Sequence, residues 1–162
     1  MIFGGSQERN RRGGTENVPG IIGGAKAIEI AQSEMKDNEK KIEEIKRRFT
    51  KGVNDINDGN IKFNGGENTS PYLLSLSFDP EHYQNDAESM LMFLDINGIA
   101  ASNGAACTSG TLKPSHVILS MGNSKEYANG TIRFSFGPQN TNEEVDYTVD
   151  VLQKMMKKFR VS

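Results

Sequence analysis

Cys107 is the only cysteine of this 162-residue chain, and it lies within the run of small and polar residues 101–110 (ASNGAACTSG). A single thiol forms no disulfide within the chain, and no second cysteine is present to complete a zinc site. A lone cysteine is commonly an inert apolar residue, whereas an exposed thiolate is a nucleophile. The glycines and hydroxyls around it favour a reactive thiol on a functional loop over residues 102–115.

Arg133 is the second candidate, because it interrupts an apolar strand pattern over residues 131–136. Strand alternation places three large apolar residues on one face: Ile132, Phe134 and Phe136. Arg133 and Ser135 then lie on the other face. A strand-borne arginine either forms a surface salt bridge or directs its planar fork at a carboxylate ligand. The residues alone favour the salt bridge and leave the ligand-binding role open.

A third candidate is Gly13-Gly14-Thr15, which precedes a helix start signal at Asn17 and Pro19. Glycines allow a close backbone approach to an anion, a helix N-terminus offers free N–H groups, and Thr15 adds a hydroxyl. The other interpretation is a flexible start followed by an ordinary helix cap. The segment matches neither a P-loop nor a dinucleotide-binding motif.

The remaining polar residues carry weaker signals. His116 follows the cysteine loop and could act as a base there, although a histidine at a helix start is more often structural. The carboxylates show no spacing typical of a metal site, so no metal is expected. The net charge of −2 predicts no general attraction to nucleic acid or to a membrane. The short apolar runs predict no membrane span, and the single cysteine favours a cytoplasmic location.

The elements that would hold these residues follow from periodicity. Apolar residues recur every seven positions from Ile21 to Phe49, which predicts one long amphipathic helix over residues 18–50. No element is expected over residues 1–14. Strands are expected at residues 61–63, 73–78, 99–102 and 131–136, and helical segments at residues 86–97 and 115–128. Thr141 and Glu144 form a capping box for a last helix whose core face comprises Val145, Val149, Leu152, Met156 and Phe159. The fold class is therefore α+β, with a small, mainly antiparallel sheet and helices on one face.

Several segments, taken in order, resemble the C-terminal part of the pyridoxal-phosphate-dependent cysteine desulfurases. These enzymes are class V aminotransferases of fold type I, and the long loop resembles their long-cysteine-loop subgroup. The matching segments are residues 4–9 (GGSQER), 12–18 (RGGTENV), 102–110 (SNGAACTSG), 112–116 (LKPSH) and 131–137 (TIRFSFG). The resemblance covers the chain from about residue 3 to its end.

The resemblance implies a role for each candidate. Cys107 matches the nucleophile that receives the sulfur atom, and it would be at most a transient iron–sulfur ligand. Arg133 matches the residue that holds the substrate carboxylate. Thr15 matches the residue that reaches the cofactor phosphate of the partner subunit. Arg12 and Gln7 are weaker candidates for shaping the entry to this cofactor site.

The resemblance also implies how the chain is organised. Residues 1–17 would be a loop segment left from the large domain, residues 18–50 a linking helix, and residues 51–162 the small C-terminal domain. The family's cofactor lysine, ring-stacking histidine and ring-pairing aspartate belong to the large domain, and no residue here matches them. The chain is therefore expected to be a fragment of a cysteine desulfurase and to be inactive alone.

The expected partners also follow from the family. They are L-cysteine, the missing large domain, a homodimer partner, and a sulfur-acceptor or iron–sulfur scaffold protein, with no nucleic acid and no membrane. The family would convert L-cysteine to L-alanine and a persulfide for iron–sulfur cluster assembly and other sulfur transfer. Two alternatives stay open: a non-catalytic dimerisation or docking domain, and a small thiol-based sulfur carrier.

Overall fold

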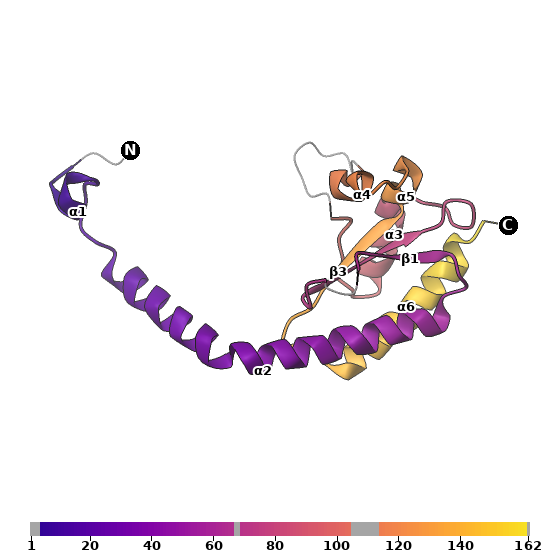
Figure 1. Ribbon diagram of the computed structural model, residues 1–162, viewed down its shortest axis with the longest axis horizontal. Coiled ribbons are helices and arrows are strands. Elements are labelled where there is room, and N and C mark those ends of the chain that lie inside the picture. The colour runs from indigo at the N-terminus through magenta and orange to yellow at the C-terminus, as the bar shows by residue number, and fades with distance from the viewer. Residues whose placement is uncertain (1–3, 67–68, 105–113, 162) are drawn as a thin grey trace. The chain divides into compact units, whose positions relative to one another are not determined.

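The computed structural model describes residues 4–66, 69–104 and 114–161. The chain divides into two compact units, Met1–Asp37 and Asn38–Ser162. The long helix α2 (Val18–Ile56) contains the boundary and contributes residues to both units (Figure 1). It begins at the residue that the periodicity predicts and continues six residues beyond the predicted end at residue 50.

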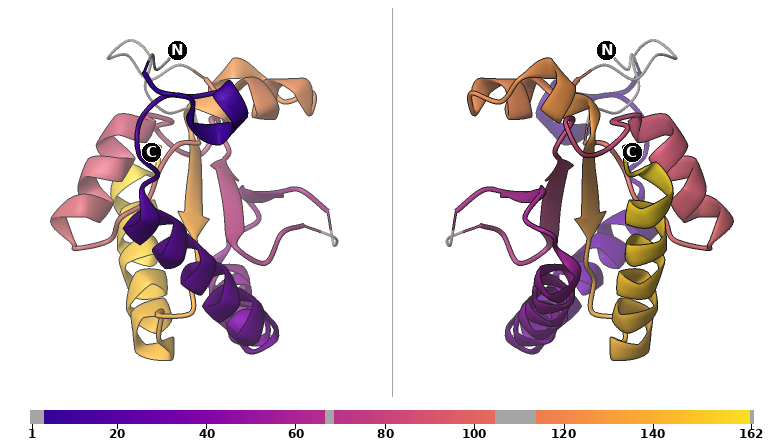
Figure 2. Two further views of the ribbon diagram at one scale, coloured as in Figure 1. Left: turned by 90° about the vertical axis from the view of Figure 1, so that its left-hand side faces the viewer. Right: turned by 90° about the vertical axis from the view of Figure 1, so that its right-hand side faces the viewer.

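A three-stranded antiparallel sheet organises the second unit. Its strands are β1 (Ile61–Asn64), β2 (Leu73–Phe78) and β3 (Thr131–Ser135), in the order β1-β2-β3. The helices α3 (Ala87–Ile96) and α6 (Asn142–Phe159) lie side by side, next to β3 (Figure 2). This arrangement confirms the predicted α+β fold with a small antiparallel sheet.

One face of the sheet packs into the hydrophobic core. Strand alternation directs Leu74, Leu76 and Phe78 of β2 inward, and Ile132 and Phe134 of β3 do the same. The second half of α2, together with α3 and α6, closes this core. The buried residues of these three helices include Ile42, Ile45, Phe49, Val53, Met90, Leu94, Val151, Leu152 and Met155. Because the core uses one face only, the opposite face of the sheet is available to polar side chains.

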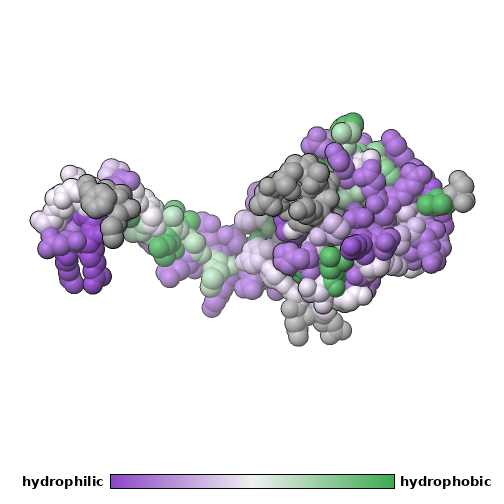
Figure 3. All heavy atoms as spheres, turned by 90° about the horizontal axis from the view of Figure 1, so that it is seen from above, coloured by the Kyte–Doolittle hydropathy of each residue, from purple (hydrophilic) through white to green (hydrophobic). Residues whose placement is uncertain are grey.

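The seven-residue apolar repeat of α2 has two different environments. Ile42 and Phe49 are buried in the core of the second unit, and the Phe49 ring lies 5.0 Å from that of Phe134. Within the first unit Ile21, Ile28 and Met35 are exposed, each by more than half of its surface. Green, apolar side chains gather along this first half of the helix in Figure 3. The repeat therefore marks a face that the described chain covers over only part of its length.

Local signals predicted the last helix correctly. The Thr141 side chain accepts a hydrogen bond from the Glu144 N–H, and the Glu144 carboxylate accepts one from the Thr141 N–H, which confirms the capping box. Four of the five expected core residues of α6 are buried, and Val149 is half-buried. Two short helices, α4 (His116–Ser120) and α5 (Lys125–Asn129), lie within or close to the predicted helical segment.

Two expectations about short segments were wrong. Residues 99–102 form a single bridge at Ser102 in place of a strand, and the Ile99 N–H donates to Leu94 O at the end of α3. Residues 1–14 contain a short helix, α1 (Gln7–Asn10), although no element was expected there. Glu8, Arg9 and Asn10 all adopt positive φ angles in it, a conformation that apolar periodicity does not reveal.

Candidate functional site

A cross-strand row of polar residues occupies the face of the sheet opposite the core. Asn64 of β1 pairs with Ser75 of β2, Ser75 pairs with Arg133 of β3, and Arg133 pairs with Ser102 through an isolated bridge. Directly paired residues of neighbouring strands project to the same face of a sheet. The register therefore places these four side chains in one line across the sheet.

Arg133 is the charged member of this row. Its side chain is half-buried, and its Nε atom is buried without a hydrogen-bond partner in the part of the chain that the structure describes. The ion pairs found among the described residues do not include it. The surface salt bridge that the sequence favoured is therefore wrong for the described residues. A guanidinium without a carboxylate partner is suited to bind an anionic ligand.

The neighbours of Arg133 in the sheet are neutral. Asn64 Nδ2 donates to Ser75 Oγ at 3.0 Å and to Ser77 Oγ at 2.8 Å. The Ser77 and Thr131 hydroxyls share a buried hydrogen bond of 2.6 Å, and Thr131 Oγ1 donates to Tyr127 O. These bonds hold the polar face in place without adding a negative charge that would neutralise Arg133.

Ser102 connects the row to the segment that carries Cys107. The Arg133 N–H donates to Ser102 O at 2.5 Å, and the Ser102 N–H donates to Arg133 O at 3.1 Å. Gly104 then takes a φ of 77°, a left-handed conformation that favours glycine. Cys107 itself lies outside the described residues, so its predicted role stays a prediction.

Gly14 and Thr15 belong to the first unit. Gly14 has a φ of 91° with no atom near the position of an added side chain, and its N–H donates to Gln7 Oε1 at 3.1 Å. The Thr15 side chain is exposed and makes no hydrogen bond to another described residue. Asn17 caps the N-terminus of α2, because its Oδ1 accepts a hydrogen bond from the Gly20 N–H at 3.1 Å. The open space at Gly14 allows a phosphate group to approach the free Thr15 hydroxyl closely.

The other sequence candidates contribute less. His116 is exposed at the first residue of α4 and makes no hydrogen bond or ion pair with another described residue. Arg12 lies 3.8 Å from Glu8, so its charge is partly paired. Within residues 4–66, 69–104 and 114–161, no cluster of three or more histidine, cysteine or acidic side chains could hold a metal ion. Among the described residues, no helix combines the length and apolar character needed to cross a bilayer.

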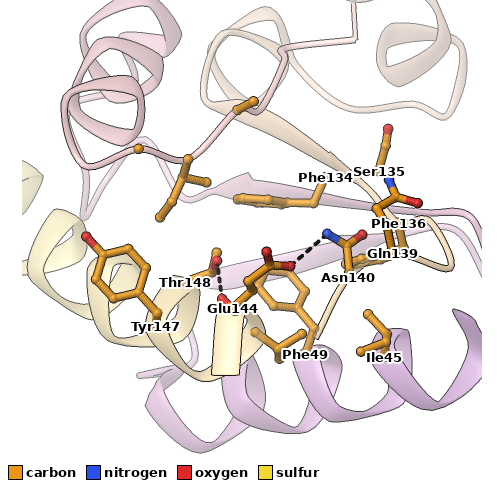
Figure 4. Close-up of a pocket in the computed structure, with 14 residues that line it drawn as sticks. Ile45, Phe49, Phe134, Ser135, Phe136, Gln139, Asn140, Glu144, Tyr147 and Thr148 are labelled. Carbon is orange, nitrogen blue, oxygen red and sulfur yellow. Dashed lines mark hydrogen bonds between the residues drawn. The ribbon is translucent and has the colours of Figure 1, made fainter. Parts of the chain in front are cut away.

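A cavity of about 350 Å³ opens between the second half of α2, the end of β3 and the start of α6 (Figure 4). Its polar groups serve the fold. Asn140 Nδ2 donates to Glu144 Oε2, the Gly137 N–H donates to Asn140 Oδ1, and Thr148 Oγ1 donates to Glu144 O. Hydrogen bonds, first from Asn140 and then from the Thr141 N–H, lower the pKa of Glu144. None of the predicted site residues lines the cavity, and its polar residues Asn140 and Glu144 cap the N-terminus of α6.

Comparison with protein families decides which family these features represent. The model of the aminotransferase class V family matches residues 5–148. The chain belongs to this family. The class V match includes both Thr15 and Arg133, and the family implies pyridoxal phosphate as the cofactor of a complete enzyme.

Individual relatives of this class V chain are cysteine desulfurases. The chain is 40% identical to cysteine desulfurase IscS of Clostridium botulinum (strain Hall) over 163 residues, covering 99% of this chain and 40% of the relative. It is 41% identical to cysteine desulfurase IscS of Dictyoglomus turgidum, with the same coverage. The chain thus spans about two fifths of the length of these relatives. The predicted resemblance to part of a cysteine desulfurase is confirmed.

Solved structures agree with the class V fold. A NifS-like protein superposes with a TM-score of 0.75 at 32% identity, covering 98% of this chain and 39% of that protein. A NifS-like protein from Rickettsia africae gives the same TM-score at 25% identity, covering 97% of this chain and 39% of that one.

Asn64, Ser75 and Ser102 are polar members of the site that sequence reasoning did not single out. The alternation of residues 61–64 places Lys62 and Asn64 on one face, which is the available signal for Asn64. The strand register that brings Asn64 into line with Arg133 depends on residues far away in the sequence.

Proposed function

We propose that this chain forms the C-terminal part of a cysteine desulfurase, which converts L-cysteine to L-alanine and a cysteine-bound persulfide for iron–sulfur cluster assembly and other sulfur transfer. The observation that carries the proposal is Arg133, a half-buried cation with no ion-pair partner among the described residues, in a chain similar to cysteine desulfurases. In this role Arg133 binds the α-carboxylate of L-cysteine through paired N–H donors.

Thr15 and Gly14 provide a second binding function in the proposal. The free Thr15 hydroxyl would hold the phosphate of pyridoxal phosphate bound in the partner subunit, and the open space at Gly14 would permit the close approach. When bound, the cofactor supplies the electron sink for the reaction. The lysine that anchors it would come from the large domain, because no residue of this chain matches that motif.

Cys107 carries the sulfur transfer in the proposal. Its thiolate attacks the sulfur atom of L-cysteine, so that an S–S bond forms while the substrate C–S bond breaks. The electron pair of the C–S bond stays with the carbon fragment, and protonation of that fragment gives L-alanine. The sulfur remains on Cys107 as a persulfide until an acceptor protein removes it. A segment rich in small residues is suited to this transfer.

The apolar face of α2 supports a missing partner domain. Val18, Ile21, Ile22, Ile28 and Met35 are all exposed by more than half within the first unit. Exposed apolar residues repeated along one helix are typical of a surface that another domain or subunit covers. We propose that the large domain and the homodimer partner cover this face in the complete enzyme.

A direct test joins this chain to the N-terminal part of the Clostridium botulinum relative, ending where the similarity to this chain begins. Purified with pyridoxal phosphate, this chimera should release sulfide from L-cysteine in the presence of a thiol reductant. The Cys107→Ala variant is the matched control and should release none. A chimera that binds the cofactor and has the circular dichroism of a folded protein, yet releases no sulfide, would contradict the proposal.

The exposed apolar half of α2 also supports a second candidate, a dimerisation or docking domain without catalysis. A sulfur carrier is the further alternative, in which Cys107 accepts a persulfide from another protein. Incubation of the chain alone with a persulfide donor protein, followed by intact mass measurement, separates these two. A gain of one sulfur atom, absent in Cys107→Ala, indicates the carrier, and an unchanged mass indicates the docking domain.

A further inference from the structure

Arg133 lies between two serines of the polar row, and these serines differ in their hydrogen bonding. Ser75 Oγ accepts a hydrogen bond from Asn64 Nδ2 at 3.0 Å. Ser102 Oγ is buried and has no partner among the described residues. Ser102 is therefore the neighbour of Arg133 whose hydroxyl has both its donor and its acceptor capacity unused.

Arg133 has a complementary requirement. Its Nε–H donor is also buried without a partner in the described part of the chain. Buried polar atoms in proteins are rarely left unpaired, because they lose hydration without replacing it. The two backbone hydrogen bonds between Arg133 and Ser102, at 2.5 and 3.1 Å, hold the residues directly opposite each other with their side chains on the same face. Among the described residues, Ser102 Oγ is therefore the unpaired buried oxygen on the residue that faces Arg133 across the bridge, and Arg133 Nε–H is the unpaired buried donor.

We propose that Ser102 is a positioning residue for Arg133, whose Nε–H its hydroxyl accepts. This bond fixes the plane of the guanidinium and leaves the two Nη groups to bind a carboxylate. Guanidinium forks bind carboxylates best when both N–H donors are aligned with the two oxygens. The proposed hydrogen bond between Ser102 and Arg133 is argued from the bridge and from the two unpaired buried atoms, whereas the carboxylate of L-cysteine as the target of Arg133 rests on the proposed function.

The hydrogen bond between Ser102 and Arg133 would link two parts of the proposed site. Ser102 begins the segment that continues to Cys107, and Arg133 would bind the substrate. A carboxylate that aligns Arg133 would then also hold Ser102, because the proposed side-chain hydrogen bond adds to the two backbone hydrogen bonds between these residues. Arg133 and the start of the segment that leads to Cys107 would therefore move together when substrate binds.

The hydrogen bond is tested on the full 162-residue chain by NMR of arginine Nε–H groups in ¹⁵N-labelled protein. The Arg133 signal is assigned by its loss in Arg133→Lys. It should exchange slowly with water in the parent and at least about tenfold faster in Ser102→Ala. Ser75→Ala is the matched control, and Ser102→Thr, which keeps a hydroxyl, should retain protection. Backbone amide spectra show that each variant is folded.

Several outcomes of this experiment would overturn the inference. One is an Arg133 Nε–H signal that is unchanged in folded Ser102→Ala. Another is a signal that responds equally to Ser75→Ala. If Ser102→Ala alone fails to fold, Ser102→Thr and Ser102→Val decide, because they differ mainly in the hydroxyl: equal exchange rates would overturn the inference.

The consequence for binding is tested in the chimera with a double-mutant cycle. Ser102→Ala should raise the KM for L-cysteine about tenfold and change kcat less, and it should have no further effect in an Arg133→Lys background. If the increases in KM caused by the two substitutions multiply in the double variant, Ser102 does not act through Arg133. Absence of sulfide release by the parent chimera would count against the proposed function, and the NMR result would still decide the role of Ser102.

Discussion

Ser102 and Arg133 exchange two backbone hydrogen bonds, from Arg133 N to Ser102 O at 2.5 Å and from Ser102 N to Arg133 O at 3.1 Å. This single bridge joins β3 to the segment that leads to Cys107. It gives a structural reason why Arg133, the proposed substrate-binding residue, and Cys107, the proposed nucleophile, would serve one site. The roles of the two residues can be separated by substitution.

Cys107→Ala and Arg133→Ala should impair the complete enzyme at different steps. Cys107→Ala should abolish persulfide formation, while L-cysteine still changes the absorbance of the bound cofactor. Arg133→Ala should raise the KM for L-cysteine by about 10- to 100-fold, because a charge-assisted pair of hydrogen bonds is lost. Full sulfur transfer by Cys107→Ala, or an unchanged KM in Arg133→Ala, would refute the corresponding assignment.

The chain alone should lack desulfurase activity even when pyridoxal phosphate is added. The reason is that no residue of the chain matches the cofactor lysine of the family. Sulfide release from L-cysteine, measured against a blank that contains free cofactor and buffer, should equal the blank. Sulfide release above the blank that depends on Cys107 would show that the chain needs no large domain.

Substitutions in the two halves of α2 should change the free energy of unfolding by very different amounts. Phe49→Ala should lower the free energy of unfolding of the chain by about 3–5 kcal/mol, because Phe49 is buried in the core. Ile28→Ser should change it by less than about 0.5 kcal/mol, because Ile28 is exposed, and it should reduce self-association. Urea unfolding and analytical ultracentrifugation measure the two effects. A large loss of stability in Ile28→Ser would show that the chain itself covers this face.

Tyr83 should make the stability of the chain depend on pH in the alkaline range. Burial, followed by the 3.0 Å hydrogen bond to Asp58, raises the pKa of Tyr83 to about 12, above the usual tyrosine value of about 10. Between these values the folded state keeps a proton that the unfolded state loses. The contribution of Tyr83 is therefore complete below pH 10 and is lost as the pH rises to 12.

Tyr83→Phe provides the measurement. Below pH 10 it should lower the free energy of unfolding by about 1 kcal/mol, the value of one hydrogen bond. The difference between parent and variant should then shrink from pH 10 to pH 12 in urea titrations. A difference that stays constant over this range would contradict the raised pKa of Tyr83.

Local signals in the sequence determined much of the fold. The Thr141 and Glu144 capping box, the alternation in β2 and β3, and the start of α2 at Val18 depend on neighbouring residues. Neighbours along the chain set helix caps and strand faces, so these features can be predicted without tertiary contacts. The motifs around Thr15, Cys107 and Arg133 likewise indicate the family by themselves, because a motif consists of residue types in a fixed order.

The tertiary structure alone decided which polar residues meet. Strand register brings Asn64 and Ser75 into line with Arg133, and one bridge adds Ser102. The sequence could not show this, because register is set by the packing of whole strands and a shift of one residue moves every side chain to the other face. The environment of α2 is of the same kind. Its apolar repeat is uniform in sequence, yet burial depends on which elements pack against each half.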